Sequence, residues 1–216
     1  MDYPISEKYE DFKAACLKCD LCDDAGIRYK DAFPLFMQRP PTNTDILFIF
    51  EAPNWADTFI PSKRYLTVDP NTDPSGKFFY ELFTEYLKLD INKYLFFTNS
   101  VLCLPLINND KYSVTSNHIK YCSMWLKVMI NIFQPKIICS IGKKALVATA
   151  YIEKHNKYNQ NLGDIVADPF QWYERVLFPL FHTGLLARKP PYGRSADLQR
   201  TDWLKLRELY NKLSAA

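Results

Sequence analysis

The sequence lacks any apolar run long enough to cross a membrane. Its apolar stretches are short, such as residues 46–50 and 137–139, whereas a membrane-spanning helix needs about 20 such residues. The first residues also lack a basic region followed by an apolar run, which argues against a secretory signal. We therefore expect a cytoplasmic protein without a membrane partner.

Glycine is scarce as well. The chain has 6 glycines in 216 residues, where average usage gives roughly 15. Internal repeats and low-complexity stretches are absent, and the contents of 48% hydrophobic and 24% charged residues are ordinary for a globular protein. This composition excludes an intrinsically disordered chain. The length favours a single domain over residues 1–216, large enough to bury a sizeable core.

The net charge of +3 is too small to indicate a nucleic-acid partner by itself. Its distribution is uneven, because residues 1–24 hold seven acidic residues against three lysines. Residues 188–207 hold two aspartates and six basic residues, Arg188, Lys189, Arg194, Arg200, Lys205 and Arg207. This basic segment could face phosphate groups, and a solvated surface explains it equally simply.

Four β-rich runs are present, at residues 46–50, 94–98, 136–141 and 175–181. Several of them lack polar alternation, which is typical of strands buried on both faces of a parallel sheet. The order of the runs in the chain favours an α/β protein, provided that helices lie between them.

Helical patterns do separate these runs, at residues 76–88, 116–133 and 143–154, and a last one covers 202–213 with Thr201 as a plausible N-cap. Alternating strands and helices predict a three-layer α/β/α sandwich around a central four-stranded parallel sheet. Ligands of such sheets bind beyond the carboxyl ends of the strands. The residues just after the four runs are Glu51, Asn99, Gly142 and His182.

The chain has six cysteines. In a reducing compartment disulfides are rare, so metal-binding or redox roles are commoner explanations for such a set. Cys16, Cys19 and Cys22 form two overlapping C-x-x-C spacings, and such a pair can bind one metal centre through both thiolates. Cys103 and Cys122 could complete a four-thiolate set for an iron–sulfur cluster or zinc. Core packing is the alternative for these cysteines, and it is the simplest interpretation of Cys139 inside the third run.

Six segments, taken in order, resemble motifs of the family 4 uracil-DNA glycosylases. The first segments are Cys16-x-x-Cys19-x-Leu21, similar to C-x-x-C-x-L, and Phe50-Glu-Ala-Pro-Asn54 with Asp57, similar to G-E-A-P-G with its trailing acid. Next come residues 98–105, similar to T-N-x-V-K-C-R-P, and Cys122 on the following helix. The last are residues 134–145, similar to P-x-x-I-x-x-L-G-x-x-A, and residues 179–188, similar to P-x-x-H-P-S-x-x-L-R.

This resemblance implies a structural [4Fe-4S] cluster with Cys16, Cys19, Cys103 and Cys122 as its ligands. Cys22 could replace Cys16 if the loop shifts, and zinc is a less favoured substitute for the cluster. Four thiolates would tie the N-terminal segment to two later elements, so that loss of one destabilises the fold.

The resemblance also implies a monofunctional DNA glycosylase, which flips a damaged or modified base and hydrolyses its N-glycosidic bond to leave an abasic site. Glu51 would be the carboxylate near the sugar or an activated water, and Asp57 would assist by positioning water or a loop. His182 would donate a hydrogen bond to the base carbonyl, and the Asn99 amide suits a pyrimidine edge. No lysine occupies a motif position that would suggest a Schiff-base lyase.

The same resemblance assigns residues that contact the base and the DNA. The pocket walls would include Ala52, Pro53 and Asn54, and stacking on the base could pass to Trp55, Phe59 or Phe78. After His182, a DNA-inserting loop would comprise Thr183, Gly184, Leu185 and Leu186, with Arg188, Lys189 and Arg194 on phosphates. The expected partner is duplex or single-stranded DNA, bound by a monomer.

Departures from the family pattern concentrate around the expected pocket. Family glycines are replaced by Phe50, Asn54 and Phe79, and the base-stacking phenylalanine of P-F-x-G-x-x-G is replaced by Pro74. Altered walls change which base is accepted, so uracil, another deaminated base and a larger modified base all remain candidates. A non-catalytic base sensor on the same fold is the alternative function, and an iron–sulfur or zinc protein of unrelated function is a third.

Overall fold

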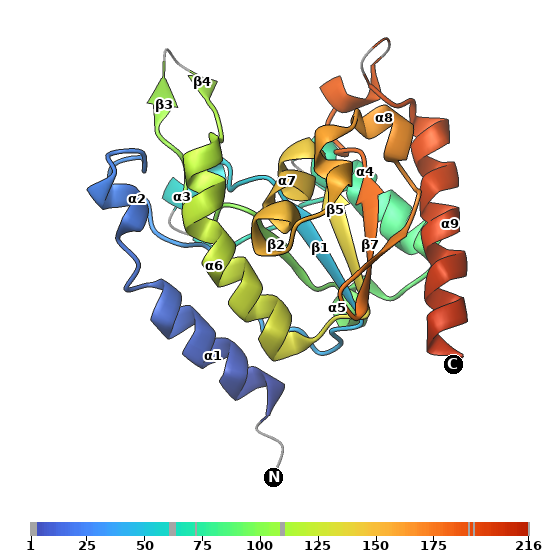
Figure 1. Cartoon of the computed structure of the whole chain (residues 1–216), viewed down its shortest axis with the longest axis horizontal. Coiled ribbons are helices and arrows are strands. Elements are labelled where there is room, and N and C mark those ends of the chain that lie inside the picture. The colour runs from blue at the N-terminus through green and yellow to red at the C-terminus, as the bar shows by residue number, and fades with distance from the viewer. Residues whose placement is uncertain are drawn as a thin grey trace.

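The computed structural model describes residues 4–60, 64–71, 73–108, 111–189, 191 and 193–215. A five-stranded sheet with the order β2-β1-β5-β7-β6 forms its centre (Figure 1). The parallel strands are β1 (Ile46–Phe50), β2 (Phe97–Asn99), β5 (Ile137–Ile141) and β7 (Arg175–Leu180). The predicted α/β class with a four-stranded parallel sheet is confirmed for these strands.

A fifth strand, β6 (Phe170–Trp172), pairs antiparallel with β7 at the edge of the sheet and was missed by the sequence analysis. It is only three residues long, and residues 173–174 turn the chain directly into β7. Tyr173 makes this turn with a φ of 56°, a left-handed conformation typical of tight hairpins. So short a segment carries little periodicity, which explains why the pattern of the sequence did not reveal it.

Helices cover both faces of the sheet. One face carries α1 (Ile5–Cys16), α6 (Ser116–Phe133) and α7 (Lys143–Ile152). The other face carries α4 (Pro74–Glu81), its π-helical continuation η1 (Leu82–Leu87) and α9 (Ala196–Ser214). Figure 1 shows α1 and α6 together at one side of the sheet and α9 at the other. The predicted three layers are therefore present.

Side-chain alternation along β1 supplies both hydrophobic layers. Leu47 and Ile49 belong to the cluster under α6 and α7, whereas Phe48 belongs to the cluster under α4 and α9. Phe48 stacks on Trp203 of α9, with ring centroids 5.5 Å apart and planes 8° apart. Trp203 is only 1% exposed, so this stack anchors the last helix on the sheet.

Two element boundaries differ from the predictions. The second strand begins at Phe97 because residues 91–94 form a short helix, α5 (Ile91–Tyr94), capped by the Asp90 carboxylate. Helix α9 begins at Ala196, and Ser195 is its N-cap rather than Thr201. The Thr201 hydroxyl instead donates to the carbonyl of Asp197, one turn earlier.

The remaining elements are short. They are α2 (Leu21–Asp24), α3 (Trp55–Phe59), α8 (Leu162–Ile165), the β3 (Ile107–Asn108) and β4 (Lys111–Tyr112) pair, and the 3-10 helices η2 (Asn156–Asn159) and η3 (Leu186–Arg188). Among the residues that the structure describes, no helix combines the length and apolar character needed to span a bilayer.

Candidate active site at the carboxyl ends of the strands

A cavity of about 270 Å³ lies beyond the carboxyl ends of β1, β2 and β7. It brings together Glu51, Asn99 and His182, which span more than 130 residues of the chain but follow or end parallel strands of one sheet. Asp57 lines the same cavity. All four residues that the sequence analysis assigned to catalysis therefore meet in one place, where this fold class binds ligands.

The backbone after β1 fixes the position of Glu51. Its carbonyl accepts hydrogen bonds from the Val101 amide at 3.0 Å and from the Ser100 hydroxyl at 2.6 Å. Burial raises the pKa of the Glu51 carboxyl above its ordinary value, and the nearby Lys144 ammonium partly opposes that rise in pKa. The side chain is therefore a carboxylate whose proton affinity has been increased, which suits a group that activates water.

The ring of His182 is held in one tautomer. Its Nδ1 accepts a hydrogen bond from the Gly184 amide at 2.9 Å, so the neutral imidazole carries its proton on Nε2. Burial lowers the pKa of His182, although the Asp73 carboxylate opposes this change in pKa. A Cβ at position 184 would lie 2.9 Å from Nδ1, so a glycine is required for this close approach. The result is a neutral Nε2–H donor at the cavity.

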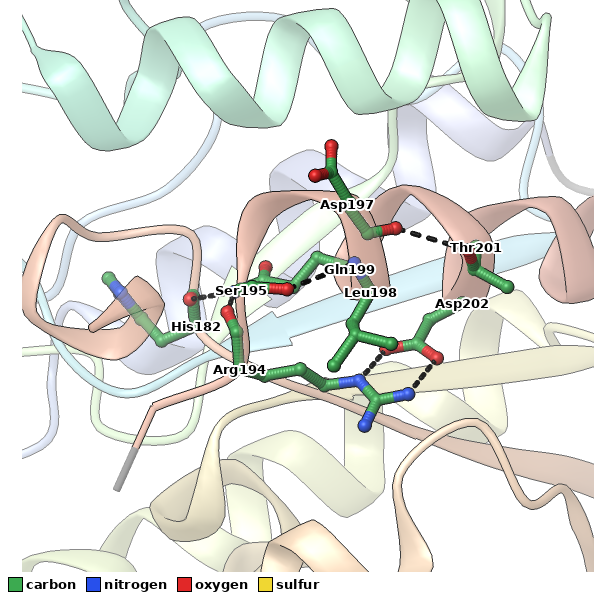
Figure 2. Close-up of polar contacts among 8 residues, drawn as sticks. All are labelled: His182, Arg194, Ser195, Asp197, Leu198, Gln199, Thr201 and Asp202. Atoms are coloured by element: carbon green, nitrogen blue, oxygen red, sulfur yellow. Dashed lines mark hydrogen bonds and ion pairs between the residues drawn. The ribbon is translucent and has the colours of Figure 1, made fainter. Parts of the chain in front are cut away.

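Helix α9 supports the loop that carries His182, as Figure 2 shows. The Gln199 side chain donates to the carbonyls of His182 at 3.5 Å and Arg194 at 3.0 Å. The Arg194 guanidinium forms a bidentate pair with the buried Asp202 carboxylate, at 2.5 and 2.7 Å. This pairing already occupies the Arg194 guanidinium, and phosphate binding by Arg194 stays a prediction.

Asp57 and Asn54 organise the wall after β1. The Asn54 side chain caps α3 by accepting the Asp57 amide at 2.8 Å, and Asp57 accepts the Thr67 hydroxyl at 2.9 Å. Asp57 is buried, so its carboxylate ties α3 to the segment around residue 67. Ala52 and Pro53 also line the cavity, as the sequence analysis expected of pocket residues.

Phe50, Asn54 and Phe79, the three positions at which the sequence departs from the glycines of the motifs that it resembles, all line the cavity. The rings of Phe50 and Phe79 lie 5.3 Å apart, and Phe50 lies 6.4 Å from the His182 ring in an edge-on arrangement. Phe97 extends this aromatic wall, 6.0 Å from Phe50. Aromatic rings therefore form part of the cavity wall.

Two residues assigned to the base pocket lie elsewhere. Phe59 packs edge-on against Tyr29 at 5.2 Å, and Phe78 is buried beneath the Arg188 guanidinium, 4.4 Å from it. Successive helical residues point about 100° apart, so Phe79 reaches the cavity and Phe78 does not. The side chain of Trp55 lies outside the part that the structure describes.

The sequence analysis missed several cavity residues, among them Thr67, Asp73 and Ser75. Asp73 had a recognisable signal, because an aspartate directly before Pro74 is typical of a helix N-cap. The capping is observed, since Asp73 accepts the amides of Ser75 and Gly76. No comparable signal marks Thr67, which lies in an irregular segment.

The expected DNA-inserting loop begins with a buried residue and has an exposed tip. Thr183 is fully buried and its hydroxyl lies 2.9 Å from that of Ser75. Leu185 and Leu186 are 55% and 83% exposed. Lys189 is also exposed, so apolar and basic side chains face solvent together beside the cavity.

Five cysteines gather where α1, α2 and α6 meet. The Cys22 thiol contacts the Cys122 thiol, a contact that lowers the pKa of Cys22. Burial, followed by the neighbouring Cys19 and Cys103, raises the pKa of Cys16. Within the described residues, however, no three or more His, Cys, Asp or Glu side chains are arranged closely enough to bind a metal ion.

The other cysteine and two histidines are structural. Cys139 is completely buried in β5. His118 belongs to the capping box at the start of α6, and its Nε2 lies 2.8 Å from the Ile27 carbonyl. His155 lies 2.9 Å from the Thr149 hydroxyl. Neither histidine is among the residues that line the cavity.

With this fold and cavity established, the chain belongs to the uracil DNA glycosylase superfamily, which its sequence matches over residues 36–207. It is also similar to a type-4 uracil-DNA glycosylase from Sulfurisphaera tokodaii. The two are 27% identical over 172 residues, which cover 76% of this chain and 70% of the relative. The match contains both Glu51 and His182. Membership of this superfamily supports DNA glycosylase activity with DNA as the substrate.

Proposed function

We propose that this protein is a monofunctional DNA glycosylase, which hydrolyses the N-glycosidic bond of a flipped base. The observation that carries the proposal is that Glu51, Asn99 and His182 line one cavity in a chain of this superfamily. A cavity of about 270 Å³ can enclose a single base only after the nucleotide has left the stack.

The residues divide the reaction between them. The bond between C1′ and the base nitrogen breaks with its electron pair passing to the base. The Nε2–H of His182 donates to the departing base, and Asn99 holds its edge. A water adds to C1′ as hydroxide while Glu51 takes its proton, and Asp57 holds the adjoining wall through Thr67. The products are a free base and an abasic site.

The aromatic wall favours a base other than plain uracil. Phe50, Asn54 and Phe79 place side chains where the related motif has glycines, and Pro74 stands at the position of the stacking phenylalanine. Stacking on the base then falls to the Phe50–Phe79 pair, 5.3 Å apart at the cavity. Another deaminated base or a modified base is the proposed substrate class.

The loop after His182 is proposed to contact DNA. Leu185 and Leu186 would occupy the gap left by the flipped nucleotide, and Lys189 and Arg188 would approach phosphates. Thr183 and Gly184 would hold the start of this loop in place, Thr183 through its contact with Ser75 and Gly184 through its hydrogen bond to His182.

A [4Fe-4S] cluster is proposed at the five gathered cysteines. The donor chemistry supports this, because the five thiols influence one another's pKa and the Arg28 guanidinium, which pairs with Asp23, also donates a hydrogen bond to Cys103. Cys16, Cys19, Cys103 and Cys122 would hold the cluster, with Cys22 able to replace Cys16, and zinc would be a less favoured substitute. When bound, the group would supply structural cross-links between α1, α6 and the chain after β2.

The test is cleavage of duplex and single-stranded oligonucleotides carrying uracil, hypoxanthine, xanthine or bulky modified cytosines, followed by alkali. We expect strand cleavage by the wild-type protein and at least a 100-fold loss, on the order of general-acid or general-base catalysis, in Glu51→Ala and His182→Ala. The matched control is His155→Ala, which removes a histidine outside the cavity. Tight binding without cleavage of any substrate would instead favour a base sensor.

A further inference from the structure

Asp73 is a carboxylate placed at the cavity by this particular sequence. The segment Asp73-Pro74-Ser75-Gly76 stands where the related motif reads P-F-x-G, so Asp73 takes the place of a proline. Its side chain lines the cavity together with Glu51, Asn99 and His182. An acidic group has thus been added where the stacking segment has been lost.

The position of this carboxylate is fixed. One oxygen accepts the Ser75 amide at 2.9 Å and the other accepts the Gly76 amide at 3.0 Å. The Gly76 backbone packs closely against Asp69, because a Cβ at this position would lie 2.5 Å from the Asp69 carbonyl oxygen. Since each carboxylate oxygen has two acceptor sites, the two amides leave capacity for a further donor.

The electrostatics of the cavity favour a ligand that donates hydrogen bonds. No lysine or arginine is among the described residues that line it, whereas Glu51, Asp57 and Asp73 are. A carboxylate accepts from an exocyclic amino group and repels a carbonyl oxygen in the same place. Cytosine-type and adenine-type bases carry such an amino group, and their deaminated counterparts carry a carbonyl.

We propose that Asp73 makes the cavity selective for bases that retain an exocyclic amino group, by accepting a hydrogen bond from it. This inference rests on the proposed glycosylase function and names the substrate class of the same site. Products of deamination carry a carbonyl in place of the amino group, so they are the disfavoured substrates at Asp73.

The experiment compares substrates that differ only in this group. One pair of oligonucleotides carries 5-hydroxymethylcytosine or 5-hydroxymethyluracil, and a second carries adenine or hypoxanthine. Cleavage rates and binding constants are measured for the wild type and for Asp73→Asn, which keeps an N-cap and removes the charge. Asp90→Asn is the matched control, because Asp90 caps α5 on the surface in the same way.

We expect the wild type to favour the amino-bearing member of at least one pair by 10-fold or more, on the order of one specific base contact. Asp73→Asn should reduce that preference by about 10-fold, whereas Asp90→Asn should leave it unchanged. The pair that shows the effect identifies a cytosine-type or an adenine-type base. A preference for the carbonyl-bearing members, or an equal loss on both members of each pair, would overturn the inference.

The experiment distinguishes failure of the proposed glycosylase function from failure of the proposed selectivity. If no oligonucleotide is cleaved, the binding constants still test the selectivity, because a sensor built on the same cavity would discriminate between the same pairs. Equal binding of both members by the wild type would then contradict the inference, whatever the protein's activity.

Discussion

Individual side chains set the protonation states that the proposed chemistry needs. Burial raises the pKa of Glu51 and lowers the pKa of His182, so both groups move toward their neutral forms. For His182 the neutral form is the useful donor, since Gly184 already occupies Nδ1. For Glu51 the carboxylate is needed, and the Lys144 ammonium is the group that favours it.

This balance predicts the acidic limb of the activity profile. The rate should fall as the pH decreases through the raised pKa of Glu51, because a protonated Glu51 can no longer act as the general base. Lys144→Met should shift this limb to higher pH, since the cation that lowers the pKa is lost. The measurement is single-turnover cleavage across pH, with Lys127→Met on the exposed face of α6 as the control. An unchanged limb in Lys144→Met would contradict this assignment.

Residue patterns in the sequence located the candidate catalytic residues but not all residues of the cavity wall. Glu51, Asn99 and His182 could be predicted because each follows or ends a buried strand, and parallel strands end at one edge. Phe78 was predicted in place of Phe79, because the exact phase of α4 could not be read from the sequence. Thr67 could not be found at all, because it reaches the cavity from an irregular segment.

At the level of elements, α9 serves the site although it lies on the other face of the sheet from α6. Its first turns hold the loop after β7 through Gln199 and the Arg194–Asp202 pair (Figure 2). The sequence predicted a helix here but began it at residue 202, so the turns that contact the loop were the part left out. Polar residues such as Ser195 and Gln199 obscured the start, because their role depends on tertiary contacts.

The Arg194–Asp202 pair predicts a large effect on stability. The Asp202 side chain is 1% exposed, so Arg194→Ala leaves a buried carboxylate without its partner. The free energy of unfolding should fall by about 3 kcal/mol, measured by urea denaturation. Lys136→Ala, which breaks the more exposed pair with Asp45, should cost less than about 1 kcal/mol. Equal effects of the two substitutions would show that Asp202 is solvated in the folded protein.

For the whole molecule, the cysteines connect segments that are distant in the chain. Cys16 ends α1, Cys122 lies within α6, and Cys103 follows β2. A shared metal centre would therefore stabilise the layer formed by α1 and α6 as a unit. The sequence predicted the thiol set by resemblance alone, because spacing cannot show that residues 16 and 122 meet.

Loss of one thiol should accordingly affect metal content and folding together. Cys122→Ser should lower bound iron and the absorbance at about 400 nm, and should lower the melting temperature. Cys139→Ala should retain iron, because Cys139 is buried in β5 away from the other thiols, and should cost about 1 kcal/mol. Iron analysis and thermal unfolding of both variants provide the measurement. Full iron content in Cys122→Ser would remove Cys122 from the ligand set.

The support of His182 by α9 also sets an order of events during synthesis. A ribosome makes Glu51 and Asn99 long before residues 194–202, yet the loop that carries His182 is held by Gln199 and by the Arg194–Asp202 pair. Strands β1, β2 and β5 can pair while the chain is still growing. The nascent protein should therefore acquire its sheet first and the ability to act on DNA last, after the first turns of α9 have emerged.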